Sequence, residues 1–199
     1  MIILLVFLSF SIGTAQNQAT LQKAFSESYT LEADGNYTKA IQVLKDVYFE
    51  KSYELNLRLG WLHYYAGLFT ESAVYYQQAI NLMPMSIEAR LGYALPASAL
   101  GQWDAILLKY KEILEIDPNH SLTNYRIGSI YYGRQDYSNA ERYLQKVVNM
   151  YPFDYDTLLL LAWTKYSLGK SNEAKTLFQK VLLYDPDDES AKEGLALLK

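Results

Sequence analysis

Four of the five prolines in this 199-residue chain lie on a strict period. Pro84, Pro118, Pro152 and Pro186 follow one another at intervals of 34 residues. Glycines recur about halfway along these intervals, and three of them lie 17 residues before the proline that closes the interval. A fixed period of this size is the sequence signature of a repeat architecture, so each interval is expected to hold one structural unit.

Each interval contains two segments whose apolar residues recur at helical spacing. Leu57, Trp61 and Tyr64 illustrate the first segment, and Ala140 and Leu144 illustrate the second. A glycine ends the first helix because it adopts a left-handed conformation at little cost. A proline follows the second helix because it cannot continue the hydrogen-bond ladder. The pattern therefore predicts an all-α chain of helical hairpins.

The composition argues against several classes of function. The net charge of −4 repels phosphate backbones, so nucleic acid is not an expected partner. The chain has no cysteine, which excludes disulfides, thiolate zinc sites and cysteine nucleophiles. It has two histidines and no glycine-rich phosphate-binding motif. We therefore predict a protein that is not an enzyme, without catalytic residues, cofactor or metal.

The N-terminal segment has the pattern of an export signal. Residues 2–12 are uncharged and mostly apolar, and the small residues Gly13, Thr14 and Ala15 follow. A run of this length is typical of a cleavable signal peptide, whereas a bilayer span needs about 20 apolar residues. We predict a signal peptide over residues 1–15, a short polar segment over 16–20, and a periplasmic or secreted mature chain without a membrane span. The alternative is that residues 2–10 form a buried first helix.

The motif spacing resembles that of the tetratricopeptide repeat (TPR) family, which places an aromatic residue, Leu-Gly, Tyr, Ala, a second aromatic residue and Pro at fixed offsets. The interval that holds Gly128, Tyr131, Ala140 and Pro152 carries this pattern most fully. The resemblance implies a right-handed α-solenoid of TPR hairpins (an alpha-alpha superhelix). It covers residues 21–186 as repeats 21–52, 53–86, 87–120, 121–154 and 155–186, followed by a C-terminal capping helix over 187–199.

Three features refine this picture. Small residues such as Gly60 and Gly128 recur where the two helices of a pair are expected to cross closely. The first aromatic position of the family pattern is instead polar at Asn56 and Asn124. Pro96 lies off the lattice, inside a predicted helix, where it is expected to kink the helix and to change the curvature of the array or shape a notch.

The resemblance also implies a ligand groove along the first helix of each repeat, at its second, fifth, ninth and twelfth positions. The residues there form an aromatic stripe with acidic edges, which suits an apolar or basic-aromatic peptide segment. The basic residues with which some family members clamp a C-terminal carboxylate are missing. The candidate groove residues are Phe25, Tyr29, Glu54, Leu57, Trp61, Tyr64, Glu88, Leu91, Leu95, Tyr125, Tyr132, Asp156, Leu159, Trp163 and Tyr166.

These observations leave three functions open. The favoured one is a protein-protein interaction scaffold outside the cytoplasm, such as an accessory subunit of an envelope complex. The second is a structural spacer that self-associates through its end repeats. The third is a hydrolase with an unrecognised carboxylate site. The aromatic stripe also has a plain structural explanation, in which its side chains pack against the neighbouring repeat.

Overall fold

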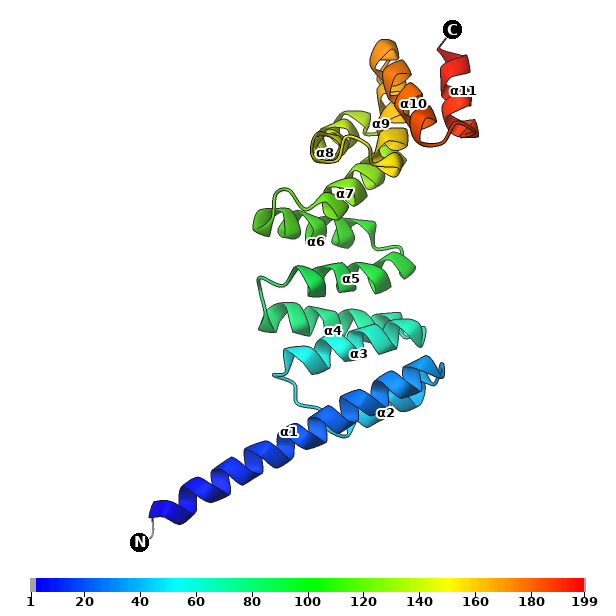
Figure 1. Ribbon diagram of the computed structural model, residues 1–199. Coiled ribbons are helices and arrows are strands. Elements are labelled where there is room, and N and C mark those ends of the chain that lie inside the picture. The colour runs from blue at the N-terminus through cyan, green and yellow to red at the C-terminus, as the bar shows by residue number, and fades with distance from the viewer. Residues whose placement is uncertain (1–2, 199) are drawn as a thin grey trace. The chain divides into compact units, whose positions relative to one another are not determined.

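The computed structural model describes the backbone of residues 3–198 and the side chains of residues 18–198. Every regular element within this range is an α-helix, and no strand occurs in it (Figure 1). The expectation of an all-α chain is therefore confirmed. The helices group into two compact units, residues 1–102 and residues 103–199.

The first unit comprises α1 (Ile3–Ala33), α2 (Tyr37–Lys45), α3 (Tyr53–Tyr65), α4 (Phe69–Leu82) and α5 (Ile87–Ala99). α1 packs on α2, α2 on α3, α3 on α4, and α5 on both α3 and α4. Leu44, Leu55, Leu59 and Leu62 are fully buried at the centre of this unit. Pro96 is also buried, and helix α5 continues beyond it as far as Ala99.

Helix α1 includes most of the segment that the sequence predicts as a signal peptide. It begins at Ile3 and runs without interruption to Ala33. The placement of residues 1 and 2, and the side chains of the predicted signal up to residue 15, lie outside what the structure describes. Within the described residues, no helix combines the length and apolar character that crossing a membrane requires.

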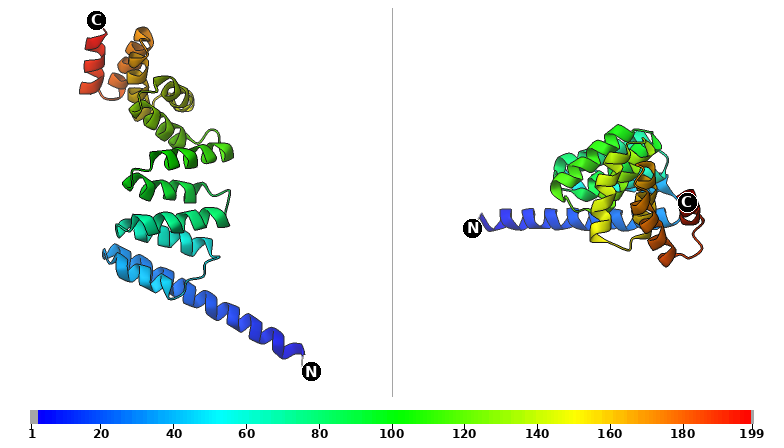
Figure 2. Two further views of the ribbon diagram at one scale, coloured as in Figure 1. Left: turned by 180° about the vertical axis from the view of Figure 1, so that it is seen from behind. Right: turned by 90° about the horizontal axis from the view of Figure 1, so that it is seen from above.

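The second unit comprises α6 (Trp103–Ile116), α7 (Ser121–Gly133), α8 (Tyr137–Met150), α9 (Tyr155–Ser167), α10 (Ser171–Tyr184) and α11 (Glu189–Leu197). Consecutive helices pack together, and α9 also contacts α7 and α11. Figure 2 shows this unit from the opposite side, with α11 next to α10. Leu144, Leu158, Leu161 and Phe178 are fully buried in its core.

Helix starts repeat with the same period as the prolines. The N-cap residues of α3, α5, α7, α9 and α11 each accept a hydrogen bond from the backbone amide three residues later. Such a cap satisfies one of the orphan amides of the first helical turn. His120 caps α7 through its ring nitrogen. These N-caps are Ser52, Ser86, His120, Asp154 and Asp188.

The turns within the hairpins confirm the predicted role of glycine, with one exception. Gly35, Gly67, Gly101 and Gly169 have positive φ, a conformation that costs glycine little. In the remaining hairpin the left-handed residue is Gln135, with φ of 60°. Gly133, the nearest glycine, is the last residue of α7 and lies two residues before this position. A non-glycine residue in this conformation costs roughly 1–2 kcal/mol.

Close helix crossings explain the recurring small residues. A Cβ atom added at Gly60 would lie 2.9 Å from the Tyr76 ring, and one at Gly128 would lie 2.6 Å from Cγ of Leu144. A Cβ at Gly92 would come within 2.2 Å of the same buried Tyr76 ring, a crossing that the spacing alone does not reveal. Larger side chains at these positions would force the helices apart.

The polar residues at the family's first aromatic position hold the loop before each helix. The Asn56 side-chain amide donates to the carbonyls of Glu50 and Ser52, at 2.9 and 2.7 Å. Asn124 makes the two equivalent bonds, at 3.1 Å each, to the carbonyls six and four residues before it. Arg90 donates at 2.9 Å to the carbonyl four residues before it. In these three repeats, hydrogen bonding takes the place of aromatic packing at this position.

Candidate functional site

Several side chains of the predicted groove stripe in the first unit contact other residues of the same unit. The Trp61 indole nitrogen donates to Glu32 at 2.5 Å, and Glu32 also forms an ion pair with Arg58 at 2.6 Å. The Arg58 guanidinium lies 3.9 Å from the centre of the Tyr29 ring, a cation–π distance. Arg58 is buried and organises these side chains, although sequence reasoning did not single it out.

The other stripe residues of the first unit divide by exposure. Glu54 is exposed and accepts a hydrogen bond from Ser52 at 2.9 Å. Tyr64 is half-buried, with its ring centre 5.7 Å from that of Phe69. Leu57 packs against the core between α4 and α5. Four further stripe residues of this unit are half-buried or exposed: Phe25, Glu88, Leu91 and Leu95.

A tyrosine closes the junction between α3 and α5. The hydroxyl of Tyr53 lies 2.8 Å from Oγ of Ser86, the N-cap of α5, and it donates to Glu88 at 3.2 Å. Burial raises the pKa of Tyr53 further above its ordinary value of 10.0, at which the phenol is already protonated at neutral pH. Tyr53 therefore fills the space between the starts of these two helices.

Some side chains of the groove stripe in the second unit also pack against neighbouring helices of that unit. The Trp163 indole nitrogen donates to Ser190 of α11 at 2.9 Å. The Trp163 ring packs edge-on against the Phe178 ring, with 5.0 Å between the ring centres. Tyr166 lies edge-on to Trp163 at 5.6 Å. Leu159 packs against the core, and Tyr132 is half-buried. These placements leave Tyr125 and Asp156, at the starts of α7 and α9, as the stripe residues beside an open space.

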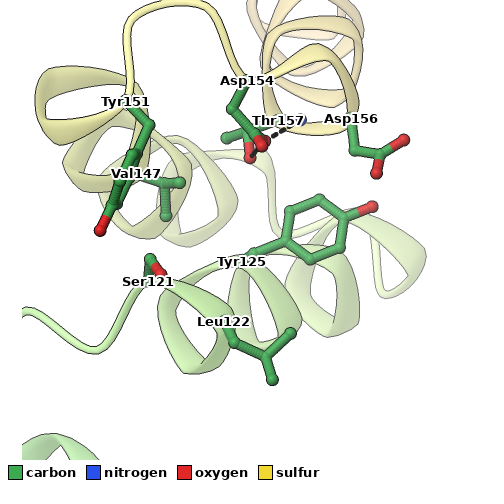
Figure 3. Close-up of a pocket in the computed structure, with 8 residues that line it drawn as sticks. All are labelled: Ser121, Leu122, Tyr125, Val147, Tyr151, Asp154, Asp156 and Thr157. Carbon is green, nitrogen blue, oxygen red and sulfur yellow. Dashed lines mark hydrogen bonds between the residues drawn. The ribbon is translucent and has the colours of Figure 1, made fainter.

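That space is a hollow of about 410 Å³ between the start of α7, the end of α8 and the start of α9, which we call the α7–α9 hollow (Figure 3). Sequence reasoning placed Tyr125 and Asp156 in a groove and gave no role to Ser121 or Tyr151. None of the lining residues carries a positive charge. They are Ser121, Leu122, Tyr125, Val147, Tyr151, Asp154, Asp156 and Thr157.

A small residue stands at the hollow, in a repeat position that holds tyrosine in two other repeats. Ser121 is the first residue of α7, as Tyr53 is of α3 and Tyr155 is of α9. The Tyr155 hydroxyl donates to Asp188, the N-cap of α11, and this bond raises the pKa of Tyr155 to about 12. Ser121 has no ring, so nothing comparable spans the distance to Asp154 (Figure 3).

Asp154 and Asp188 are equivalent N-cap residues, but among the residues that the structure describes only Asp188 accepts hydrogen bonds with both of its carboxylate oxygens. Oδ1 of Asp154 accepts from the backbone amide of Thr157 at 3.0 Å and also from the Thr157 hydroxyl. In Asp188 one oxygen accepts from the amide of Ala191 at 2.6 Å, and the other accepts from Tyr155. Within the described part of the chain, no group donates to Oδ2 of Asp154. The hollow thus combines apolar and aromatic side chains with polar ones, among them the exposed Asp154, whose second carboxylate oxygen has no donor within the described residues.

The surroundings of the buried His63 indicate a structural role for this residue. His63 is buried, and its ring nitrogen donates to the Leu59 carbonyl at 2.7 Å. Burial lowers the pKa of His63, which keeps the ring neutral. Over the described residues, no three His, Asp or Glu side chains gather in a way that would hold a metal ion.

Comparisons with known sequences point to one family. A family model described as tetratricopeptide repeat matches residues 131–198. The TPR repeat-containing protein YpiA of Bacillus subtilis (strain 168) is 24% identical over 174 residues, which are 85% of this chain and 40% of that protein. The chain therefore spans less than half the length of this curated relative.

Solved structures share the fold at low sequence identity. A tetratricopeptide repeat protein from Parabacteroides merdae ATCC 43184 has a TM-score of 0.77 at 23% identity, covering 90% of this chain and 72% of that one. MamA from Desulfovibrio magneticus RS-1 has a TM-score of 0.72 at 16% identity, covering 85% and 97%.

YrrB, described as a TPR protein with an unusual peptide-binding site, has a TM-score of 0.72 at 12% identity and covers 92% of this chain and 96% of that one. These likenesses confirm the expected α-solenoid of helical hairpins. The TPR family model thus matches residues 131–198, and over the rest of the chain the likeness to TPR proteins is one of fold and of low sequence identity.

Proposed function

We propose that this chain is a non-enzymatic interaction scaffold that binds a peptide or protein segment, with the α7–α9 hollow as part of its binding surface. The observation that carries the proposal is the hollow itself, because it opens beside two residues of the predicted groove stripe, Tyr125 and Asp156. A concave site with apolar walls and a few polar groups is the usual form of a binding site. The fold that the chain shares with a peptide-binding TPR protein supports the proposal.

The chemistry of the hollow favours an apolar or basic-aromatic segment over an acidic one. Leu122 and Tyr151 are 42% and 54% exposed and offer apolar surface to a bound segment. Asp156 is exposed and forms no ion pair with any residue that the structure describes. A negative rim attracts positively charged partners and repels negatively charged ones.

Site-specific photo-cross-linking tests the binding surface. The full chain would carry a photo-reactive residue at Leu122, and in a matched control at Gln145, which lines a different hollow on α8. Each protein is irradiated in an extract of the cells that produce it, and the adducts are identified by mass spectrometry. We expect one protein partner from position 122 that Asp156→Lys removes and Gln145→Lys does not. Equal labelling from both positions would contradict the proposal.

Substitution of the two groove tryptophans would test binding less cleanly. Trp61 and Trp163 each donate a hydrogen bond to a neighbouring helix and pack against a core cluster. Truncating them to alanine would remove these contacts together with any contact to a ligand. Substitutions at Leu122 and Asp156 avoid this because both side chains are exposed.

We also propose that the chain acts outside the cytoplasm, in the periplasm or as a secreted protein, and that an envelope complex is the setting in which it meets its partner. The support is the uncharged apolar run over residues 2–12, followed by small residues. Fractionation of the producing cells, with N-terminal sequencing of the protein recovered from each fraction, tests this. We expect a chain that begins at Gln16 outside the cytoplasm. An intact chain confined to the cytoplasm would contradict it.

Self-association is the second candidate function. It is favoured by the last helix, where Leu197 remains 53% exposed although its neighbour Leu198 packs against the core. A helix that leaves apolar surface open can pair with a second copy of the chain. Light scattering at high protein concentration distinguishes the two functions, because a monomer excludes the spacer and a Leu197-dependent dimer supports it.

A further inference from the structure

Two repeats of this chain already show what fills the space that the α7–α9 hollow leaves empty. Tyr53 reaches Ser86 across the junction of α3 and α5, and Tyr155 reaches Asp188 across the junction of α9 and α11. In both cases a tyrosine at the first position of one helix meets the N-cap of another. Ser121 breaks this pattern in the second unit, although the N-cap it faces, Asp154, is present.

We infer that the α7–α9 hollow binds a tyrosine side chain of the partner segment, whose phenol hydroxyl donates to Oδ2 of Asp154. This inference rests on the proposed function, because it identifies the group by which the bound segment is anchored. The partner's ring would take the place that Tyr53 and Tyr155 take in their own junctions.

The walls of the hollow suit an aromatic ring. Val147 is buried beneath it, and the Tyr125 and Tyr151 rings flank it (Figure 3). Aromatic side chains bury large areas and prefer offset or edge-on contact with other rings. The volume of about 410 Å³ accommodates a phenol ring together with neighbouring atoms of the segment that carries it.

The polar groups of the hollow suit a neutral donor. Oδ1 of Asp154 is occupied by the helix cap, so one oxygen remains for one donor. The equivalent arrangement at Asp188 is satisfied by the single hydroxyl of Tyr155. A hydrogen bond from a neutral donor to a carboxylate is among the stronger kinds, and leaving the oxygen unpaired under a ligand would cost binding energy. A phenylalanine in the same place would therefore bind less well than a tyrosine.

Titration of the full chain with p-cresol, the side-chain analogue of tyrosine, tests the inference. Backbone amide signals are followed by NMR, with toluene and butylamine as analogues of phenylalanine and lysine. We expect saturable shifts confined to residues 121–125 and 147–157, with a dissociation constant on the order of 1 mM, as befits so small a ligand. Toluene should bind several-fold more weakly. Shifts elsewhere, no saturable shifts, or stronger binding of butylamine or toluene would overturn the inference.

Two variants extend the test. Ser121→Tyr supplies the ring from within the chain, so p-cresol binding should be lost. Asp154→Asn keeps a good N-cap residue but removes the charge, so p-cresol should bind several-fold more weakly. Unchanged binding in both variants would contradict the inference, and the wild-type titration decides it even if a variant fails to fold. A partner that is cross-linked from position 122 but is not displaced by p-cresol would leave the proposed function standing and this inference refuted.

Discussion

The same repeat positions form the junction of α3 with α5 in the first unit and the junction of α7 with α9 in the second. The first junction is filled by a side chain, whereas the second contains a hollow. In the first unit, Tyr53 spans the junction and its hydroxyl meets the cap of the next helix. In the second, Ser121 occupies that position and a hollow remains, with Asp154 at its rim. The closed and the open junction thus differ in the residue at this one repeat position. In a repeat protein, the departures from the repeat are where a binding site can be sought.

The largest expected effect comes from opening the closed junction. Tyr53→Ser copies the second unit's residue into the first, which removes a half-buried ring and its hydrogen bonds. Full burial of an aromatic residue is worth about 3–5 kcal/mol on truncation, so this half-buried side chain should cost about 2 kcal/mol. Urea unfolding followed by the fluorescence of Trp61, the one tryptophan in residues 1–102, measures it.

Tyr53→Phe is the control for this substitution, since it keeps the ring and loses only the hydroxyl. It should lose about 1 kcal/mol, the typical net value of a hydrogen bond. Equal losses for the two substitutions would show that the ring does not fill the junction, and the comparison between the units would fail.

Alkaline pH should weaken the junction closed by Tyr155. Its pKa is raised from the ordinary 10.0 to about 12 because the protonated hydroxyl donates to Asp188. The bond therefore stabilises the folded state fully below about pH 10, and its contribution is lost as the pH rises from 10 to 12. The Tm of the wild type should fall more steeply over this window than that of Tyr155→Phe. Parallel pH profiles would show that the hydroxyl contributes no such stabilisation.

Closing the open junction should stabilise the second unit. Ser121→Tyr adds a ring where Tyr53 and Tyr155 have theirs, and its hydroxyl can donate to Asp154. We expect a gain of about 1 kcal/mol, since added apolar burial and one hydrogen bond are offset by the ordering of the side chain. Urea unfolding followed by the fluorescence of Trp163 measures it. A loss of stability would mean that the hollow has a different shape from the tyrosine sites.

The smallest expected effect concerns the second departure in the same repeat. Gln135→Gly places glycine where the other hairpins have it and relieves the left-handed strain at φ of 60°. Glycine also gains freedom in the unfolded chain, so the net stabilisation should be about 0.5 kcal/mol. The matched Gly169→Gln should destabilise by a similar amount. A destabilising Gln135→Gly would indicate that the glutamine side chain has a role of its own.

Much of the fold could be predicted because its signals lie in the period. The prolines, the turn glycines and the small residues at helix crossings each report one local geometric requirement. Asn56 and Asn124 looked like departures from the family pattern, yet each makes local hydrogen bonds with the loop before its helix.

The site could be predicted only in part. Tyr125 and Asp156 follow from their positions on the first helices of their repeats, whereas Ser121 at a helix start looks unremarkable by itself. Its meaning appears when it is aligned with Tyr53 and Tyr155, and when those tyrosines are seen to meet a cap 33 residues further on. The commitment of Trp61 and Trp163 to neighbouring helices is likewise a contact between helices that spacing does not encode.

The most direct test of the account compares the affinity of the captured partner segment for the wild-type chain and for Ser121→Tyr, by titration calorimetry on the full proteins. The account predicts that Ser121→Tyr is at least as stable as the wild type and binds the segment at least tenfold more weakly, a difference of about 1.4 kcal/mol. Equal affinity for the two proteins would contradict it, because the segment would then bind without entering the α7–α9 hollow.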